Sequence, residues 1–294
     1  MRLVCLGECM VEMAPAGDGR FVQGFAGDTF NTAWALRRIC PEDWQIGYAT
    51  ALGDDPLSTE MVAFMQAGGI CTRDIRILPG RTCGLYLITL VEGERSFAYW
   101  RENSAARQML GDVGWLPGVL AGAQAIFLSG ISLAILPPEH REALVSALEG
   151  YGGKLFFDPN YRPRLWADAA LARDWMLRLA RRAEILLPSL DDCAALLGHE
   201  TAEAAAQALA EAGAREVVIT DGAGPVTIAQ DGAFMQLPPA PAAPPVDTTG
   251  AGDAFNAGYL AARLQGEAPE EAARNGQRLS RRVIATRGAL LGAA

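Results

Sequence analysis

Histidine is scarce in this sequence, and its cysteines are not spaced as metal ligands. Only His140 and His199 occur among 294 residues, and both lie in polar stretches beside expected helices. The six cysteines form no Cys-x-x-Cys pair, and no histidine follows them at zinc spacing. A zinc site is therefore disfavoured, and so is a Ser-His-Asp hydrolase, because Gly-x-Ser-x-Gly is also missing. The cysteines instead predict reduced thiols in a cytoplasmic protein.

Positive charge is in deficit, and long apolar runs are missing. The 25 Lys and Arg residues face 34 Asp and Glu residues, which gives a formal net charge of −9. Such a surface repels nucleic acid and anionic membranes, so neither is an expected partner. One long uncharged stretch, Val113–Pro138, is broken by proline, glycine and serine and predicts a loop and a buried strand. Leu3–Leu6 is too short for a signal peptide.

Short apolar runs alternate along the chain with longer runs rich in Ala, Leu and Arg. This order predicts an α/β fold with a mostly parallel sheet that is covered by helices on both faces. The expected strands are Leu3–Gly7, Ile46–Leu52, Ala125–Leu128, Lys154–Asp158, Glu184–Leu187 and Glu216–Thr220. The expected helices are Phe30–Ile39, Ser58–Ala67, Pro138–Glu149, Leu171–Arg182 and Glu203–Ala212.

One region departs from this alternation. Gly84–Leu90 and Ser96–Trp100 are strand-like, and only the turn-like Glu92-Gly93-Glu94 lies between them, which predicts a hairpin outside the main sheet. A flap of this kind can close over a substrate and exclude water. An edge hairpin without a function fits the pattern equally well.

The most informative segment is Asp247–Phe255, which reads Asp-Thr-Thr-Gly-Ala-Gly-Asp-Ala-Phe. It follows a stiff connector with five prolines, Leu237–Val246, and opens an Ala-rich helix that runs to about Leu264. Its glycines let the backbone approach a ligand, and the free N–H groups of the first helical turn favour a phosphoryl group. Asp253 lies beside them, placed to accept a proton from an attacking hydroxyl. A bare Gly-x-Gly-Asp would instead favour a carboxylate that only complements the helix dipole.

The common nucleotide-binding fingerprints are missing, and a different resemblance replaces them. There is no P-loop, and no Gly-x-Gly-x-x-Gly follows the first strand. Asp247–Phe255 resembles the C-terminal signature of the ribokinase-like sugar kinases, also called the PfkB family. Residues 26–33, Ala-Gly-Asp-Thr-Phe-Asn-Thr-Ala, resemble the family's N-terminal glycine motif, with Ala26 in place of its usual first glycine.

The resemblance implies a ribokinase-like three-layer sandwich, an α/β fold with a mostly parallel central sheet and a small β-lid. Residues 1–294 would form a single kinase domain, with a discontinuous lid from roughly 9–26 and 71–102. The hairpin expected from the sequence pattern falls where that lid belongs.

Three further segments, Phe127–Ala134, Phe157–Trp166 and Tyr99–Arg101, resemble the 2-keto-3-deoxygluconate (KDG) kinases of this family. This implies transfer of phosphate from ATP, with magnesium, to the terminal hydroxyl of KDG. A homo-oligomer, dimer or higher, is also expected. A related kinase for fructose or ribose is an alternative, and so is a sugar-acid-binding regulator that has lost catalysis.

KDG carries a carboxylate, which prefers the bidentate fork of arginine. Arg101 comes two residues after Tyr99, a spacing that puts both on one face of a strand, and Arg162 follows an expected strand at the edge where ligands of such sheets collect. The alternatives are a solvated surface charge for each arginine and lid packing for each tyrosine. The substrate-binding residues implied by the resemblance are Gly27, Asp28, Asn31, Tyr86, Tyr99, Arg101, Arg162 and Asp253. The catalytic residues implied are Asp253 as base and Gly250, Ala251 and Gly252, whose turn holds the phosphoryl group.

The resemblance also implies a nucleotide side of the site. The cofactor-binding residues expected there are Thr220, Asp221, Gly222, Gly224, Gly250, Ala251, Gly252, Asn275 and Ser189. Thr220 stands where the family often has lysine, and an ordinary glycine turn explains that loop equally well. Asp192 is a candidate for magnesium through water, and Asp247 and Thr249 for a monovalent cation such as potassium. Helix capping is the alternative for Ser189, Asp191 and Asn275.

Overall fold

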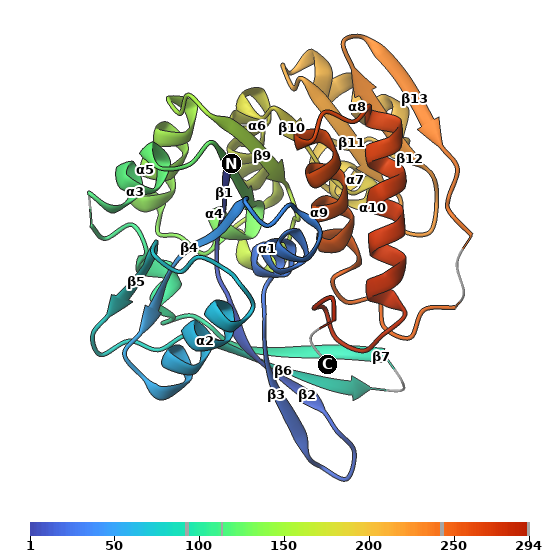
Figure 1. Cartoon of the computed structure of the whole chain (residues 1–294). Helices are drawn as coiled ribbons and strands as arrows, with labels where there is room; N and C mark the ends of the chain where they lie inside the picture. Colours follow the sequence, from blue (N-terminus) through green and yellow to red (C-terminus); the bar gives the residue numbers. More distant parts are fainter. Residues whose placement is uncertain (92–93, 113, 242–243, 293–294) are drawn as a thin grey trace.

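The computed structural model describes residues 1–91, 94–112, 114–241 and 244–292 (Figure 1). A large sheet runs through its centre in the strand order β13-β12-β11-β10-β9-β8-β1-β4-β5. The pairs from β11 to β5 are parallel, whereas β12 and β13 are added antiparallel. The strands are β1 (Arg2–Leu6), β4 (Gln45–Gly53), β5 (Ile75–Leu78), β8 (Ala125–Ser129), β9 (Lys154–Asp158), β10 (Ile185–Leu186), β11 (Glu216–Thr220), β12 (Val226–Gln230) and β13 (Ala233–Leu237).

Successive side chains of a strand point to opposite faces of the sheet. Because the strands carry apolar side chains on both faces, helices cover both. Leu3 and Cys5 belong to one buried cluster, and Val4 and Leu6 to the other. The first face packs against α1 (Asp28–Ile39), α2 (Pro56–Ala67), α9 (Ala251–Leu264) and α10 (Pro269–Ile284). The second packs against α3 (Trp115–Ala121), α4 (Gly130–Ala134), α5 (Pro138–Glu149), α6 (Ala169–Arg182), α7 (Leu190–Leu197) and α8 (Ala202–Glu211). The predicted three-layer α/β arrangement with a mostly parallel sheet is confirmed.

A second, smaller sheet projects below the main body in Figure 1. Its strand order is β3-β2-β6-β7, formed by β2 (Met10–Pro15), β3 (Phe21–Ala26), β6 (Gly84–Val91) and β7 (Glu94–Trp100). The β6 and β7 strands pair antiparallel, with Tyr86 opposite Tyr99, which confirms the predicted hairpin. Residues 92–93 of its expected turn lie outside the described residues. We call the β3-β2-β6-β7 sheet the small sheet.

The sequence-based expectations were incomplete in several places. Residues 71–102 were expected in the lid, but β5 lies within them and extends the large sheet. The uncharged stretch 114–138 contains β8, as predicted, but also the helices α3 and α4 instead of a loop. The hairpin of β12 and β13 was not predicted, because its strands are short and β13 is largely exposed, so no clear alternation of hydrophobic residues marks it.

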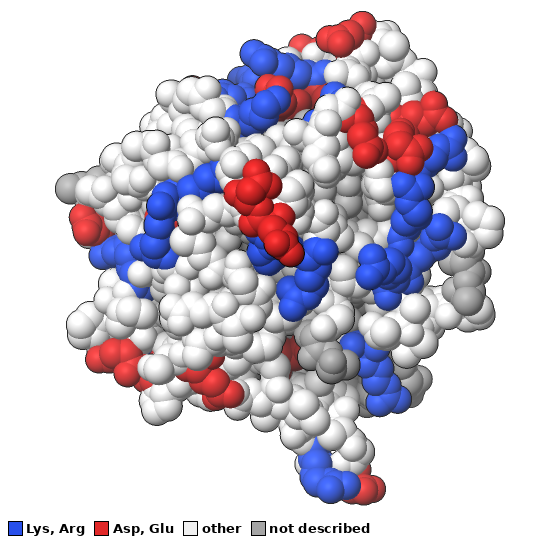
Figure 2. All heavy atoms as spheres, in the orientation of Figure 1, with Lys and Arg blue, Asp and Glu red and all other residues white. Residues whose placement is uncertain are grey.

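The surface charges, the helices and the cysteines of the structure agree with what the composition led us to expect. Figure 2 shows acidic and basic side chains interspersed on the face that it presents, with arginines gathered over α10. Among the helices that the structure describes, none is both long and apolar enough to cross a membrane. All six cysteines are free thiols, and most are buried.

Candidate active site

Several polar residues meet at the carboxyl edge of the large sheet. Asp158 ends β9, and Ser189 and Thr220 lie beside each other after β10 and at the end of β11. The first turns of α1 and α9 reach the same edge, where Asn31 bonds to Asp253. Parallel strands bring their carboxyl ends together, which is why residues far apart in sequence gather here.

Asp253 lies in the first turn of α9, directly after a glycine turn. Gly250 has φ 77°, a left-handed conformation that favours glycine. A Cβ atom placed on Gly252 would meet no atom within 4 Å, so the space at this end of the helix is open. The free N–H groups of the first turn therefore have access to a ligand.

The carboxylate of Asp253 is buried and held in one orientation. Its Oδ2 atom accepts a hydrogen bond of 2.8 Å from Nδ2 of Asn31. Burial, and secondarily the charge of Asp28, raise the pKa of Asp253 to about 7, while Asn31 and Arg162 oppose that shift. A carboxylate with a pKa near neutrality is suited to take a proton from a hydroxyl at cellular pH.

Two further aspartates are bound by amide groups nearby. Asp28 Oδ2 accepts a 2.7 Å hydrogen bond from Asn160 Nδ2, and Asp158 Oδ2 accepts a 2.8 Å bond from Asn256 Nδ2. Burial, followed by the charges of Asp192, Asp253 and Asp28, raises the pKa of Asp158 well above its usual range. The sequence analysis assigned no role to Asp158, Asn160 or Asn256. The spacing of Asn256, three residues after Asp253 on one helix, was the available signal.

Gly27 begins α1 at a point of close backbone contact. A Cβ atom there would lie 2.2 Å from the carbonyl oxygen of Glu8, so no larger residue fits without movement. Its N–H donates to Oδ1 of Asn31 at 3.3 Å. The glycine therefore lets the first turn of α1 approach the end of β1 and fixes the side chain that holds Asp253.

On the small sheet, the predicted tyrosines lie together. The rings of Tyr86 and Tyr99 are 5.9 Å apart, and the hydroxyl of Tyr86 donates to Glu12. Tyr86 is buried, whereas Tyr99 is 48% exposed. Arg101 lies 5.9 Å from the ring of Tyr99, as expected for residues on one face of a strand.

Arg101 already has an anionic partner. Its guanidinium donates to the buried carboxylate of Glu8, which also accepts the hydroxyl of Ser104. Arg101 itself is only 8% exposed. The sequence analysis missed Glu8, although a carboxylate directly after an apolar strand is a candidate for a buried ion pair.

Arg162 differs from Arg101 in its exposure to solvent and in its ion pairing. It is exposed, at the start of a short 3-10 turn, Pro163–Leu165, that follows β9. Among the described residues, no ion pair includes Arg162. Its charge nevertheless lies close enough to Asp253 and Asp192 to favour their ionised forms.

The residues expected on the nucleotide side fall into two groups. Thr220 donates its N–H to the carbonyl of Pro188, beside Ser189, and Asp221–Gly224 form the turn between β11 and β12. Asp247 accepts hydrogen bonds from the N–H groups of Thr249 and Gly288, at 2.9 and 2.8 Å.

Two residues of the nucleotide side have well-defined structural partners. Ser189 caps α7 in a capping box with Asp192, which confirms the capping alternative for Ser189. Asn275 lies in the middle of α10, where it donates to Glu267 at 2.8 Å, so the capping alternative is wrong for this residue.

The sequence matches the family described as "pfkB family carbohydrate kinase" over residues 1–293. This chain belongs to the pfkB family of carbohydrate kinases. A curated relative, the 2-dehydro-3-deoxygluconokinase of Dickeya dadantii (strain 3937), is 39% identical over 98% of this kinase and 96% of its own length.

Solved structures agree with this kinase in fold. The PfkB protein from Polaromonas sp. JS666 superimposes with a TM-score of 0.85 at 27% identity, covering 97% of this chain and 96% of that one. An Escherichia coli protein described as a ribokinase II, solved with ATP and Mg²⁺, reaches a TM-score of 0.83 at 22% identity, covering 100% and 96%.

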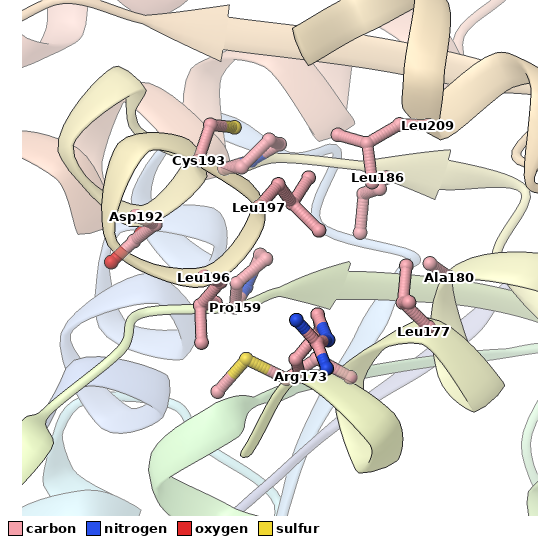
Figure 3. Close-up of a pocket in the computed structure, with 12 residues that line it drawn as sticks. Pro159, Arg173, Leu177, Ala180, Leu186, Asp192, Cys193, Leu196, Leu197 and Leu209 are labelled. Carbon is pink, nitrogen blue, oxygen red and sulfur yellow. The ribbon is translucent and has the colours of Figure 1, made fainter. Parts of the chain in front are cut away.

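A cavity beside α7 does not compete with the sheet edge as the site of this kinase. It is lined by Asp192, Arg173 and mostly apolar side chains from α6, α7 and α8 (Figure 3). Its volume of about 20 Å³ has room for one water molecule, not for a sugar or a nucleotide.

Proposed function

We propose that this kinase transfers the γ-phosphate of ATP to the terminal hydroxyl of KDG, giving 2-keto-3-deoxy-6-phosphogluconate and ADP. The observation that carries the proposal is Arg162, an arginine without an ion-pair partner among the described residues, next to the buried carboxylate of Asp253. In a protein of net charge −9, such an arginine supplies the local positive charge that an acidic sugar needs. The similarity to a 2-dehydro-3-deoxygluconokinase supports the same substrate.

In this proposal Asp253 is the general base. As the hydroxyl oxygen of the sugar bonds to the γ-phosphorus of ATP, its proton moves to Asp253 and the bond from phosphorus to the departing ADP oxygen breaks. Asn31 keeps the carboxylate turned toward the sugar through its 2.8 Å hydrogen bond. The N–H groups of Gly252 and Asp253 lie in the first turn of α9 and would stabilise the charge of the phosphoryl oxygens, whereas the N–H of Ala251 donates to the carbonyl of Thr248 at 3.2 Å.

The carboxylate of KDG is assigned to Arg162 rather than to Arg101. The charge of Arg101 is balanced by Glu8, whereas that of Arg162 faces the site without a pairing carboxylate among the described residues. Gly27, Asp28 and Asn31 approach the sugar from α1, and Tyr86 and Tyr99 from the small sheet, which serves as the lid. Arg101 then supports the lid from behind.

Magnesium fits this site as a companion of ATP. The described residues contain no group of three or more His, Cys, Asp or Glu side chains that could hold a metal ion. Asp192 already accepts N–H groups from Tyr161 at 2.9 Å and Ser189 at 3.3 Å, so it suits a hydrated ion that it contacts through water. When bound, magnesium supplies positive charge that neutralises the phosphate oxygens.

The remaining nucleotide assignments are part of the same proposal. ATP lies across Thr220–Gly224, Gly250–Gly252 and residues 287–289, which follow α10 and include the N–H donor Gly288, with Ser189 beside Thr220 and Asn275 toward the adenine. A monovalent cation such as potassium lies near Asp247 and Thr249, which a turnover assay with and without potassium tests. We also infer a homo-oligomer, which light scattering coupled to gel filtration tests.

A coupled assay that follows ADP release on KDG, fructose and ribose tests the proposal. We expect turnover on KDG with at least tenfold higher kcat/KM than on either neutral sugar, because only KDG engages the arginine. Turnover of fructose or ribose but not KDG would replace the substrate assignment. Tight binding of KDG without ADP release would favour the sugar-acid-binding regulator instead.

A further inference from the structure

Six side chains form a closed ring of alternating carboxylates and amides around the base. Asn31 donates to Asp253 at 2.8 Å, Asn160 to Asp28 at 2.7 Å, and Asn256 to Asp158 at 2.8 Å. The backbone closes the remaining steps. Asp28 and Asn31 share the first turn of α1, Asp253 and Asn256 the first turns of α9, and the N–H of Asn160 donates to Asp158 Oδ1 at 2.9 Å.

The amides of the ring offset the cost of placing three carboxylates close together in a buried site. The three aspartates lie close together: the charge of Asp28 raises the pKa of Asp253, and the charges of Asp253 and Asp28 raise the pKa of Asp158. Neutral amides donate hydrogen bonds to the carboxylates without an ion pair that would fix the proton affinity. The charged groups that act on the pKa of Asp253 are Asp28 from α1 and Arg162 from the loop after β9, while the pKa of Asp158 on β9 is raised by the charges of Asp192, Asp253 and Asp28.

Asn160 is the member of the ring whose backbone is least ordinary. Its φ of 35° makes it one of three non-glycine residues with positive φ among the described residues. The other two, Asp18 and Asp231, are exposed, and Asp231 lies in the turn between β12 and β13. Asparagine tolerates this conformation better than most residues, and such strain persists where the surroundings hold it in place. Here the surroundings are the two aspartates that Asn160 joins.

We propose that Asn160 is a positioning residue for catalysis, whose amide holds the carboxylate of Asp28 and, through Asp28 and α1, the position of Asp253, the proton acceptor. The inference rests on the proposed role of Asp253 as the base. Asn160 itself bonds to no atom of Asp253; its effect passes through Asp28 and the shared turn of α1. Loss of the amide leaves the Asp28 carboxylate free to turn, and a shift of about 1 Å at a reacting group can cost 10²-fold in rate.

Two variants separate the amide from the backbone. Asn160→Gly keeps the left-handed conformation and removes the amide, and we expect kcat to fall about tenfold with a smaller change in KM. Asn160→Asp keeps the size but places a carboxylate against Asp28. For this variant we expect kcat at neutral pH to fall about 100-fold, and the acid limb of its pH profile to move upward, because added negative charge favours protonated Asp253.

A reversed pair tests whether the contact itself matters. In Asp28→Asn combined with Asn160→Asp, donor and acceptor exchange places, and we expect at least a tenfold recovery of kcat over Asn160→Asp alone. The single variant Asp28→Asn completes a double-mutant cycle with the wild type, Asn160→Asp and the reversed pair. Asp231→Gly is the matched control for loss of a non-glycine residue at positive φ, and it should leave kcat unchanged.

The possible outcomes distinguish the positioning role of Asn160 from the proposed role of Asp253 as the base. Wild-type kcat in both Asn160 variants, with Asp253→Asn inactive, would overturn the positioning role and keep the base. Equal losses in both variants without recovery in the reversed pair would also overturn it, because only the backbone would then matter. Full turnover by Asp253→Asn would instead overturn the proposed function.

Discussion

Two clusters of charged side chains in this kinase are built on opposite principles. At the edge of the large sheet, three aspartates are held by three neutral amides, and no described ion pair includes them. At the root of the small sheet, the single carboxylate of Glu8 is paired with Arg101 and bonded to Ser104. The first arrangement leaves a carboxylate able to take up a proton, whereas the second fixes both charges.

The difference separates a reactive site from a structural one. A buried ion pair gains its attraction only at the expense of desolvating both groups, and removal of one partner leaves the other uncompensated. A neutral amide lowers the pKa of the carboxylate that it bonds, but for Asp253 burial and the charge of Asp28 outweigh the hydrogen bond from Asn31. We therefore expect changes in the aspartate cluster to alter rate more than stability, and changes in the Glu8 pair to do the reverse.

The sharpest test of this contrast is Asp253→Asn. We expect turnover to fall by about 10²–10⁴, the usual contribution of a general base, with sugar binding largely kept. The folded state raises the pKa of Asp253 to about 7, so its ionised form is destabilising, and stability is lost as pH rises toward and through 7. At pH 8 the variant should thus unfold at a higher temperature than the wild type. A variant that is both inactive and less stable would place Asp253 with the structural cluster.

Glu8→Gln is the corresponding change in the small sheet. It leaves the guanidinium of Arg101 buried without its anion, and the expected loss is about 3–5 kcal/mol in the free energy of unfolding. Denaturant titration measures this loss, with Glu149→Gln as control, because its exposed pair with Arg178 should contribute only about 0–1 kcal/mol. Equal small effects from both variants would show that the Glu8 pair does not hold the small sheet in place.

Arg162→Ala tests which arginine meets the substrate. Loss of a charge-assisted contact of about 1.5–3 kcal/mol should raise KM for KDG roughly 10- to 150-fold, with little change in KM for ATP and in thermal stability. The measurement is steady-state kinetics with each substrate varied in turn. An unchanged KM for KDG would show that the sugar carboxylate does not bind Arg162. The proposed difference in role between Arg162 and Arg101 would then be wrong.

The smallest expected effect is the pH dependence of the wild-type enzyme. Asp253 must be ionised to act as a base, and its pKa in the free enzyme is about 7. The value of kcat/KM should then fall roughly tenfold between pH 8 and pH 6, since this parameter reports the free enzyme. The measurement is kcat/KM for KDG as a function of pH at ATP concentrations well below the KM for ATP, where most of the enzyme is free. A flat profile across that range would mean that Asp253 is ionised throughout and that its burial is offset by neighbours.

Much of the fold followed from the sequence because it depends on local patterns. The bounds predicted for β9 and β11 match the structure, and so does the helix α5. The hairpin of the small sheet was visible because two strand-like runs adjoin with no helix between them. The strand predicted over Glu184–Leu187 is shorter, Ile185–Leu186, because its ends take part in loops rather than in pairing.

The site residues likewise divide into those that local sequence predicts and those that only long-range contacts bring together. The sequence alone determined that Asp253 follows a glycine turn in the first turn of a helix, because capping, glycine conformation and helix polarity are properties of adjacent residues. Only the tertiary structure decided that Asn160 bonds to Asp28, that Asn256 bonds to Asp158, and that Glu8 pairs with Arg101. The bonded pairs are 93 to 132 positions apart in the sequence, and Asn31 and Asp253 are 222 apart. No local pattern encodes a contact that forms only when the sheet brings its strand ends together.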